Sequence, residues 1–287
     1  MAQVRREEDV RSRGIVLRLS LALSLVFSPF PFSLFSFPLA FGAHPFLTDD
    51  TGTQGAGNWQ LELQGDFLRS DRTADGVERK SRLDAFLPVL SYGILENLDI
   101  QLGSAYVKLR TTENGVVTED ASGLSDTAVD IKWRFYDADG FSLALKSGLL
   151  LPTGDENKGV GTGSTSWGVA LLATLESGPW AFHGNVAYAQ VRFKLSQDEA
   201  ESRSDLWRVS AGTSYGITDE VKLVGEAGLR SNESRNDPLQ PDRTSQFAMI
   251  GAIYSPTKNI DLDLGFRKNF NQAEFDKAYL IGATFRW

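Results

Sequence analysis

The sequence contains no cysteine, and its 287 residues include only two histidines, His44 and His183. Disulfides and thiolate metal sites are therefore excluded. The mean hydropathy of −0.21 is too low for a bundle of membrane-spanning helices. Glycine is plentiful, at 27 residues, and aromatic residues make up 11%. This composition fits an all-β chain, including a transmembrane barrel, whose alternating strands average apolar with polar residues.

Basic residues are in the minority, and the formal net charge is −8 at pH 7. Nucleic acid is not an expected partner, because binding to its phosphates requires an excess of lysine and arginine. Acidic loops would be compatible with a lipopolysaccharide surface that divalent cations bridge. For an outer-membrane chain, the expected partners are therefore outer-membrane lipid and lipopolysaccharide.

Residues 1–42 have the composition of a secretory signal peptide. Four arginines between positions 5 and 13 precede a run of Leu, Val, Ser and Phe over 15–41, which ends in Ala40-Phe41-Gly42. Small residues at 40 and 42 predict cleavage after Gly42. A retained helical anchor is the alternative, although three prolines between positions 29 and 38 disfavour it. Residues 43–57 are then expected to form an irregular periplasmic lead-in, and 58–287 the folded domain.

The last stretch of the chain, 279–287, has the pattern of a membrane strand. Successive side chains of a strand point to opposite faces, so one face carries only apolar residues: Tyr279, Ile281, Ala283, Phe285 and Trp287. Such an ending resembles the carboxy-terminal signature of bacterial outer-membrane proteins, which the barrel-assembly machinery reads. The resemblance implies that machinery as a partner of Tyr279–Trp287. An edge strand of a soluble sandwich is the alternative.

The same alternation recurs along the chain and predicts twelve strands. Short turns and long polar stretches alternate between them, as in outer-membrane barrels, whose turns are periplasmic and whose loops are extracellular. The sequence therefore predicts an all-β fold, a single antiparallel transmembrane β-barrel of about twelve strands over 58–287 in the bacterial outer membrane, with both termini periplasmic. The expected strands are 59–67, 83–92, 98–102, 127–135, 141–151, 167–175, 180–188, 207–215, 221–229, 247–254, 260–266 and 279–287, and the long polar stretches are 69–80, 111–124, 152–163, 196–204, 231–244 and 269–276.

Charged residues at alternate positions indicate a water-filled interior. Asp130, Lys132 and Arg134 share one face of a single strand, and three charges in succession are costly to bury in a closed core. The candidates for the lumen lining are Glu62, Asp66, Asp130, Lys132, Arg134, Lys146, His183, Arg208, Lys222, Glu226, Asp261, Asp263 and Arg267. Alternation also places Arg82, Asp84, Asp99, Arg230, Lys277 and Arg286 inward. The signs nearly balance, so pairing across the lumen without strong ion selectivity is expected.

No catalytic, cofactor or metal site is predicted. The glycine-rich stretch 154–163 lacks the Gly-Lys-Ser/Thr ending of a phosphate loop. Residues 71–76 resemble a calcium loop, but Thr73 and Arg82 stand where oxygen ligands are needed. His183 invites comparison with an outer-membrane phospholipase, whose serine nucleophile lies two positions after its histidine, and that position is Asn185 here.

A family resemblance covers 44–287. It is carried by the stretch 48–55, by Asn58-Trp59-Gln60, by the turns at Tyr92-Gly93 and Tyr215-Gly216, and by Leu151-Pro-Thr-Gly-Asp155 with 159–163. Together these resemble the outer-membrane transporter family named after the MetA pathway of phenol degradation. The resemblance implies a channel-like barrel for small, aromatic or other hydrophobic compounds, and it assigns no binding residue.

The predicted function is passive passage of a small-molecule solute through an outer-membrane channel. The loops 152–163 and 231–244 are the candidates to fold over the mouth. Apolar solutes could instead leave through the wall near Gly225–Gly228. The alternatives are a plugged barrel with a structural or adhesive role, and an outer-membrane hydrolase.

Overall fold

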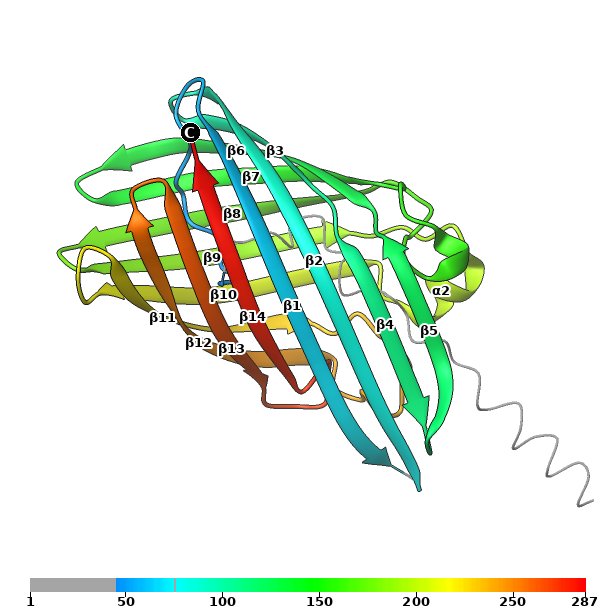
Figure 1. Ribbon diagram of the computed structural model, residues 1–287. Coiled ribbons are helices and arrows are strands. Elements are labelled where there is room, and N and C mark those ends of the chain that lie inside the picture. The colour runs from blue at the N-terminus through cyan, green and yellow to red at the C-terminus, as the bar shows by residue number, and fades with distance from the viewer. Residues whose placement is uncertain (1–44, 75) are drawn as a thin grey trace, which may run out of the picture. The chain divides into compact units, whose positions relative to one another are not determined.

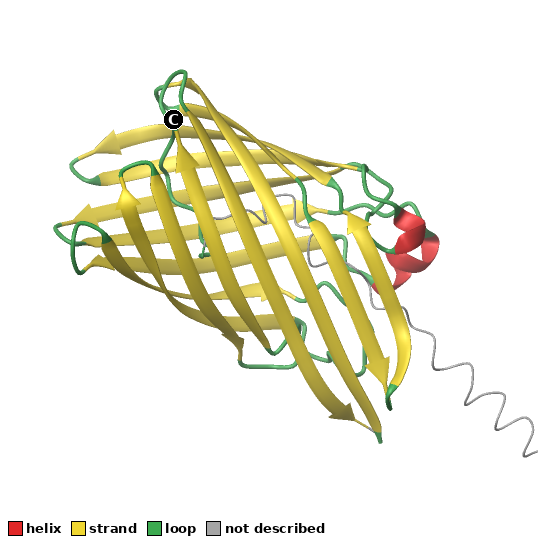
Figure 2. Ribbon diagram, viewed as in Figure 1, coloured by secondary structure: helices red, strands yellow, loops and turns green. Residues whose placement is uncertain are grey.

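The computed structural model describes residues 45–74 and 76–287. The expected signal peptide, 1–42, lies outside the described residues. Within them, no helix reaches the length and hydropathy that a membrane-spanning helix needs. The fold is all-β, as predicted, and nearly all of it is one antiparallel sheet (Figure 2).

Fourteen strand segments make up this sheet. They are β1 (Trp59–Ala74), β2 (Val77–Leu95), β3 (Leu98–Gly103), β4 (Tyr106–Glu113), β5 (Val116–Leu124), β6 (Thr127–Ala138), β7 (Phe141–Leu151), β8 (Ser166–Ser177), β9 (Trp180–Gln190), β10 (Asp205–Gly216), β11 (Val221–Ser231), β12 (Thr244–Thr257), β13 (Ile260–Asn269) and β14 (Lys277–Arg286). Two short helices, η1 (Glu156–Lys158) and α2 (Ser196–Glu201), lie in the loops.

The sheet closes on itself because β1 pairs with both β14 and β2 (Figure 1). The segments β3 and β4 both pair with β2, and β6 and β5 pair with β3 and β4 in turn. The segments β3 and β4 therefore form one long strand with a break, and β5 and β6 form another. Each full-length strand of the wall, broken or not, is called a stave here. Counted this way, the wall has twelve staves, which confirms the predicted twelve-stranded barrel.

The break between β3 and β4 lies opposite Pro88. The β2–β4 ladder ends at Phe86↔Tyr106, and the β2–β3 ladder begins at Val89↔Gly103. Proline has no N–H to donate to a ladder, which accounts for the interruption at this point. Beyond it, β5 pairs with β4 alone, so β4 and β5 continue as a hairpin whose second edge is unpaired in the described sheet.

Two stretches predicted as polar loops are strands instead. Residues 69–80 extend the β1–β2 hairpin to Ala74↔Val77, and 111–124 form most of the β4–β5 hairpin. Asn114 and Gly115 both have positive φ, 48° and 80°, as a two-residue type I′ turn requires. Polar residues occupy both faces of these hairpins, so they lack the alternation by which strands were recognised.

The outward face carries an apolar band with aromatic residues at both ends. At the end with the short turns, the turn end, Trp59 contacts Tyr92 and Trp180 contacts Tyr215 at ring distances of 4.5 and 4.6 Å. At the other end, the loop end, the exposed aromatics are Phe67, Phe86, Tyr106, Trp167, Tyr188, Trp207, Phe266 and Tyr279. Two such girdles are typical of membrane barrels.

Alternation gave the wrong face for three charged residues. Leu83 and Ala85 are buried on the inner face of β2, so Arg82 and Asp84 point outward. Both faces of this strand are rich in apolar residues, which makes its alternation ambiguous. Lys277 shares the outward face of Tyr279, because the two residues are two positions apart.

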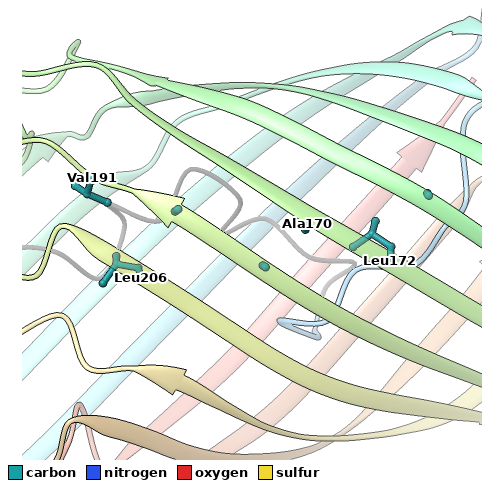
Figure 3. Packing of buried hydrophobic residues seen from close by; sticks show 7 residues of the cluster. Ala170, Leu172, Val191 and Leu206 are labelled. Atoms are coloured by element: carbon teal, nitrogen blue, oxygen red, sulfur yellow. The ribbon is translucent and has the colours of Figure 1, made fainter.

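The inner wall also has an apolar area, in addition to its charged residues. It spans β7 to β10 and consists of Ala144, Ala170, Leu172, Ala187, Ala189, Val191 and Leu206, with Phe193 packed against it (Figure 3). Lys146 pairs with Ala170, and Arg208 with Ala187, so this apolar area lies between two cations.

Leu171 lies on the outward face of β8, halfway between Trp167 in one girdle and Leu175 beside the other. Leu171→Arg is expected to cost about 2–4 kcal/mol of unfolding free energy, whereas Leu175→Arg should cost about 0–1 kcal/mol, since an arginine near an interface can reach water. Denaturant unfolding of the barrel refolded in lipid vesicles measures both. Equal costs at the two depths would contradict the assignment of the membrane-facing band.

Candidate functional site

The residues preceding β1 do not hang outside the barrel. Residues 45–57, here called the strap, enter the lumen at the turn end and cross it (Figure 1, blue). The sequence predicts an irregular periplasmic lead-in over 43–57. The strap is irregular, but its residues 45–54 lie against the inner wall.

Gly93 forms the entry point of the strap. Gly57 N–H donates to the carbonyl of Gly93 at 2.8 Å, and Gly93 N–H donates to the carbonyl of Asn58 at 2.9 Å. A Cβ at Gly93 would overlap the carbonyl oxygen of Gly55. The two backbones therefore approach as closely as they do only because position 93 has no side chain.

The near wall holds the strap through Asp99 and Glu96. Gln54 N–H donates to both carboxylate oxygens of Asp99, at 3.0 and 3.1 Å. The Thr53 hydroxyl donates to the carbonyl of Glu96 at 2.9 Å. Asp99 is fully buried, and the Gln54 N–H satisfies part of its hydrogen-bonding capacity.

Asp49 is the electrostatic centre of the strap. Its carboxylate accepts from Lys132 Nζ at 2.8 Å and from Lys146 Nζ at 3.0 Å, and all three side chains are almost fully buried. Lys146 also lies 3.7 Å from Asp130. A buried cation without an anion is strongly unfavourable, so Asp49 provides a charge that the wall needs.

Asn185 and Glu226 bind the backbone of the strap as a neighbouring strand would. Asp49 N–H donates to Asn185 Oδ1 at 2.6 Å, and Asn185 Nδ2 donates to the carbonyl of Asp49 at 2.8 Å. Further along, Thr48 N–H and Leu47 N–H donate to the two oxygens of Glu226 at 2.6 and 3.0 Å. The Thr48 hydroxyl donates to Ser210 Oγ at 2.8 Å.

Small residues of the far wall make room for the end of the strap. A Cβ at Gly212 would lie 3.1 Å from the ring of Phe46, and one at Gly265 would lie 3.1 Å from Pro45. The Phe46 ring also packs edge-on against His183 at 6.0 Å. The wall is thus shaped to hold the strap, as well as charged to hold it.

The charge on Asp49 is stable over a wide pH range. Burial by itself would raise the pKa of Asp49, but the attraction and hydrogen bonds of Lys132 and Lys146 outweigh burial and lower the pKa from 3.8 to about 2. The carboxylate is therefore ionised at any physiological pH.

Between the strap and the turn end lies a cavity of about 430 Å³. Its lining is polar and combines strap residues with both walls, including Asp50, Gln54, Glu62, Lys222, Asp261 and Arg286. Arg286 donates to Asp261 at 2.7 Å. The cavity is thus a polar vestibule on the turn-end side of the strap.

The family model described as "Putative MetA-pathway of phenol degradation" matches residues 48–287. The chain belongs to this family. The match covers the strap from Thr48 onward together with the whole barrel, so both are parts of the MetA-pathway family domain.

Solved structures show the same fold. An outer membrane channel from Pseudomonas putida F1 is 15% identical, with a TM-score of 0.62, over 83% of this chain and 98% of that one. The NanC porin is 12% identical, with a TM-score of 0.52, over 78% and 98%. The translocator domain of the autotransporter NalP from Neisseria meningitidis is 15% identical, with a TM-score of 0.50, over 83% and 91%. No curated protein matches.

The predicted lumen residues of this family member fall into three groups on the inner face. Those near the strap are Asp130, Lys132, Lys146, His183 and Glu226. Those near the turn end are Glu62, Arg134, Lys222 and Asp261. Those between the strap and the loop end are Asp66, Arg208 and Arg267. Asp263 lies on β13 between Asp261 and Gly265, the glycine that faces Pro45.

Sequence reasoning missed the residues that organise the site: Asp49, Asn185, Ser210, Thr174 and Ser142. The strap has no periodicity, and its partners are neutral side chains with nothing unusual in their sequence context. One available signal was glycine at inward positions of three separate strands, Gly93, Gly212 and Gly265, where the strap approaches the wall.

The loop 231–243 lies over the mouth of the barrel. Arg79 on the β1–β2 hairpin forms an ion pair with Asp237 at 2.6 Å, and Arg72 donates to the carbonyl of Leu239 at 2.8 Å. The loop therefore reaches from β11 to the opposite hairpin. The other predicted mouth loop is held by Asp126, which accepts from Gly154 N–H at 2.9 Å and Thr162 N–H at 2.8 Å.

Asp49→Asn keeps the shape of the side chain but leaves Lys132 and Lys146 facing a neutral amide. Breaking a buried ion pair costs about 3–5 kcal/mol, so the strap should detach and single-channel conductance in a planar bilayer should rise. Asp50→Asn is the matched control, because Asp50 is 40% exposed and lies 3.8 Å from Lys132. Identical conductance of Asp49→Asn and the wild type would show that this pair does not hold the strap.

The pKa of Asp49 also sets a pH dependence. Since folding lowers this pKa from 3.8 to about 2, the ion pairs contribute their full stability above pH 3.8 and lose it as the pH falls towards 2. Conductance should therefore stay constant from pH 7 to about pH 4 and rise below about pH 3. An increase already between pH 7 and 5 would indicate that another group controls the strap.

Proposed function

We propose that this protein is an outer-membrane channel that passes small molecules by diffusion, and that the strap controls passage through its lumen. The observation that carries the proposal is the way the strap is held. Its contacts with the inner wall are largely hydrogen bonds and ion pairs, as for Asp49 and Thr48. Water can replace polar contacts at a modest net cost, unlike a packed apolar core.

The distribution of connections supports an outer-membrane orientation. The turns 96–97, 139–140, 178–179 and 258–259 have two residues each, whereas the connections 152–165, 191–204 and 232–243 at the other end are long. Short turns are periplasmic in outer-membrane barrels, so the carboxy-terminal end of β14 would be periplasmic and the strap would enter the lumen from the periplasmic side. The exposed apolar face of β14 would be presented to the barrel-assembly machinery.

The solute class is proposed from the family and from the inner wall. The family description refers to phenol degradation. Aromatic or other hydrophobic compounds would find an apolar surface inside the barrel, on β7 to β10 beside Arg208. A lateral route at Gly225–Gly228 has no support, because β11 is paired with β10 and β12 along this stretch.

A catalytic role finds little support. The Nδ1 atom of His183 lies 3.0 Å from the Thr174 hydroxyl, but Asn185 already binds the backbone of Asp49 and cannot also orient the imidazole. A channel accounts for these residues without a reaction.

A plugged barrel with a structural or adhesive role is the second candidate. The strap in the lumen and loop 231–243 over the mouth favour it. It differs from a channel in one respect, namely that its strap never moves.

The absence of native cysteine allows a direct test. In the double variant Thr48→Cys/Ser210→Cys, a disulfide should tie the strap to β10, since the two native hydroxyls lie 2.8 Å apart. We expect conductance steps in the reduced protein and their loss on oxidation, with recovery on adding dithiothreitol. Phenol added to the reduced channel should reduce the current.

Each single variant, treated with the same oxidant, is the control. A folded, inserted barrel without conductance in either redox state, and also in Asp49→Asn, would overturn the channel and leave the plugged barrel. Conductance that oxidation does not change would retain the channel and refute control by the strap.

A further inference from the structure

Five basic residues form a row on the outward face of five adjacent staves. The register pairs Lys268 with Lys277, Lys277 with Arg69, Arg69 with Arg82, and Arg82 with Arg110. The row therefore runs without interruption across β13, β14, β1, β2 and β4, which lie side by side in Figure 1. Neighbouring strands are about 4.8 Å apart, so the row is roughly 20 Å long.

The row lies at the upper edge of the apolar band. Arg69, Arg82 and Lys277 are each ten residues from an aromatic of the turn-end girdle, namely Trp59, Tyr92 and Trp287. Ten residues span about 33 Å of strand, or about 25 Å along the barrel axis at the usual tilt, which is the height of the apolar band of such barrels. The loop-end aromatics Phe67 and Tyr279 lie two residues nearer the turn end than Arg69 and Lys277, on the same outward face.

Stability of the fold does not explain the row. Like charges directly opposite each other on neighbouring strands are destabilising. Three of the five basic residues have an acidic neighbour: Arg69 lies 2.7 Å from Asp84, Arg82 lies 3.4 Å from Asp71, and Arg110 lies 3.9 Å from Asp120. Lys268 and Lys277 form no ion pair with any residue that the structure describes.

The row is confined to one wall. On the opposite side, the outward residue two positions beyond the girdle aromatic Tyr188 on β9 is Gln190. The corresponding residue beyond Trp207 on β10 is Asp205, so neither position is basic. The Tyr188 hydroxyl donates to Asp205 at 2.5 Å. The cations are therefore not a general feature of this height, and the chain as a whole is acidic.

An apolar groove lies directly below the row. Its volume is about 580 Å³, and it is lined by Leu63, Gly65, Phe67, Phe86, Tyr106 and Ile281, with Asp84 and Lys108 among its polar lining residues. Gly65 and Ile281 both line this groove, and a Cβ at position 65 would lie only 3.1 Å from Ile281. A larger side chain at position 65 would therefore fill the groove.

We propose that this wall is a binding site for one lipopolysaccharide molecule, with its lipid A phosphates on the cationic row and an acyl chain in the groove at Gly65. Arginine and lysine bind phosphate through charge-assisted hydrogen bonds. The vertical order of the site, a cationic row above an apolar slot, matches the order of phosphate and acyl chain in the outer leaflet. The site depends on the outer-membrane orientation given above and not on channel activity.

The test measures binding of lipid A to the refolded protein in detergent by native mass spectrometry. Lys268→Gln/Lys277→Gln should weaken binding at least about tenfold, since each basic residue near an anionic surface contributes roughly fivefold. Lys158→Gln/Lys258→Gln removes the same charge from an exposed loop and an exposed turn and should bind as the wild type does. Heat-dependent gel mobility establishes that every variant is folded.

Two further measurements separate the row from the groove. Lipid A lacking both phosphates should bind the wild type and Lys268→Gln/Lys277→Gln equally weakly. Gly65→Leu should weaken binding of both forms of lipid A, because its side chain would occupy the groove. Unchanged affinity of Lys268→Gln/Lys277→Gln for phosphorylated lipid A, or equal affinity of the wild type for the two forms, would overturn the proposal.

Discussion

Hydrocarbon offers no hydrogen-bonding partner to a backbone N–H or C=O, so every such group in the wall must find its partner within the sheet. The pairing of β1 with β14 meets this requirement by leaving the sheet no free edge at its seam. Closure in turn fixes which face of each strand meets lipid and which meets the lumen. The β4–β5 hairpin, with one unpaired edge, departs from the rule in a region where water can reach its backbone.

The inner face that closure creates is unusual for a folded protein, because it buries charges in large numbers. Lys132 and Lys146 form ion pairs with Asp49, a residue that belongs to no strand. The side chains of Asn185 and Glu226 accept hydrogen bonds from backbone N–H groups of the strap, as a neighbouring strand would. The barrel and its strap therefore form one polar network, in which the wall alone is electrostatically incomplete.

The barrel could be predicted from the sequence because alternation is a local signal that each strand carries by itself. The charges of the lumen followed from the same signal, as Lys132 and Arg208 show. The strap could not be predicted, since its partners lie far away in sequence, 178 residues for Thr48 and Glu226. Alternation also failed where both faces of a strand have the same polarity, in the β4–β5 hairpin and in β2. In these strands the polarity of the side chains does not distinguish the two faces, so the inward face cannot be assigned from the sequence.

The strap is covalently joined to β1 through Gly57 and Asn58. It therefore acts as a tethered ligand of its own barrel, present at an effective concentration in the millimolar range for a short flexible connection. Its dissociation and return are unimolecular, so they do not depend on how much protein the membrane holds. Under the proposed function, a solute that binds the same wall competes with this built-in ligand, so opening requires a solute concentration high enough to displace the strap.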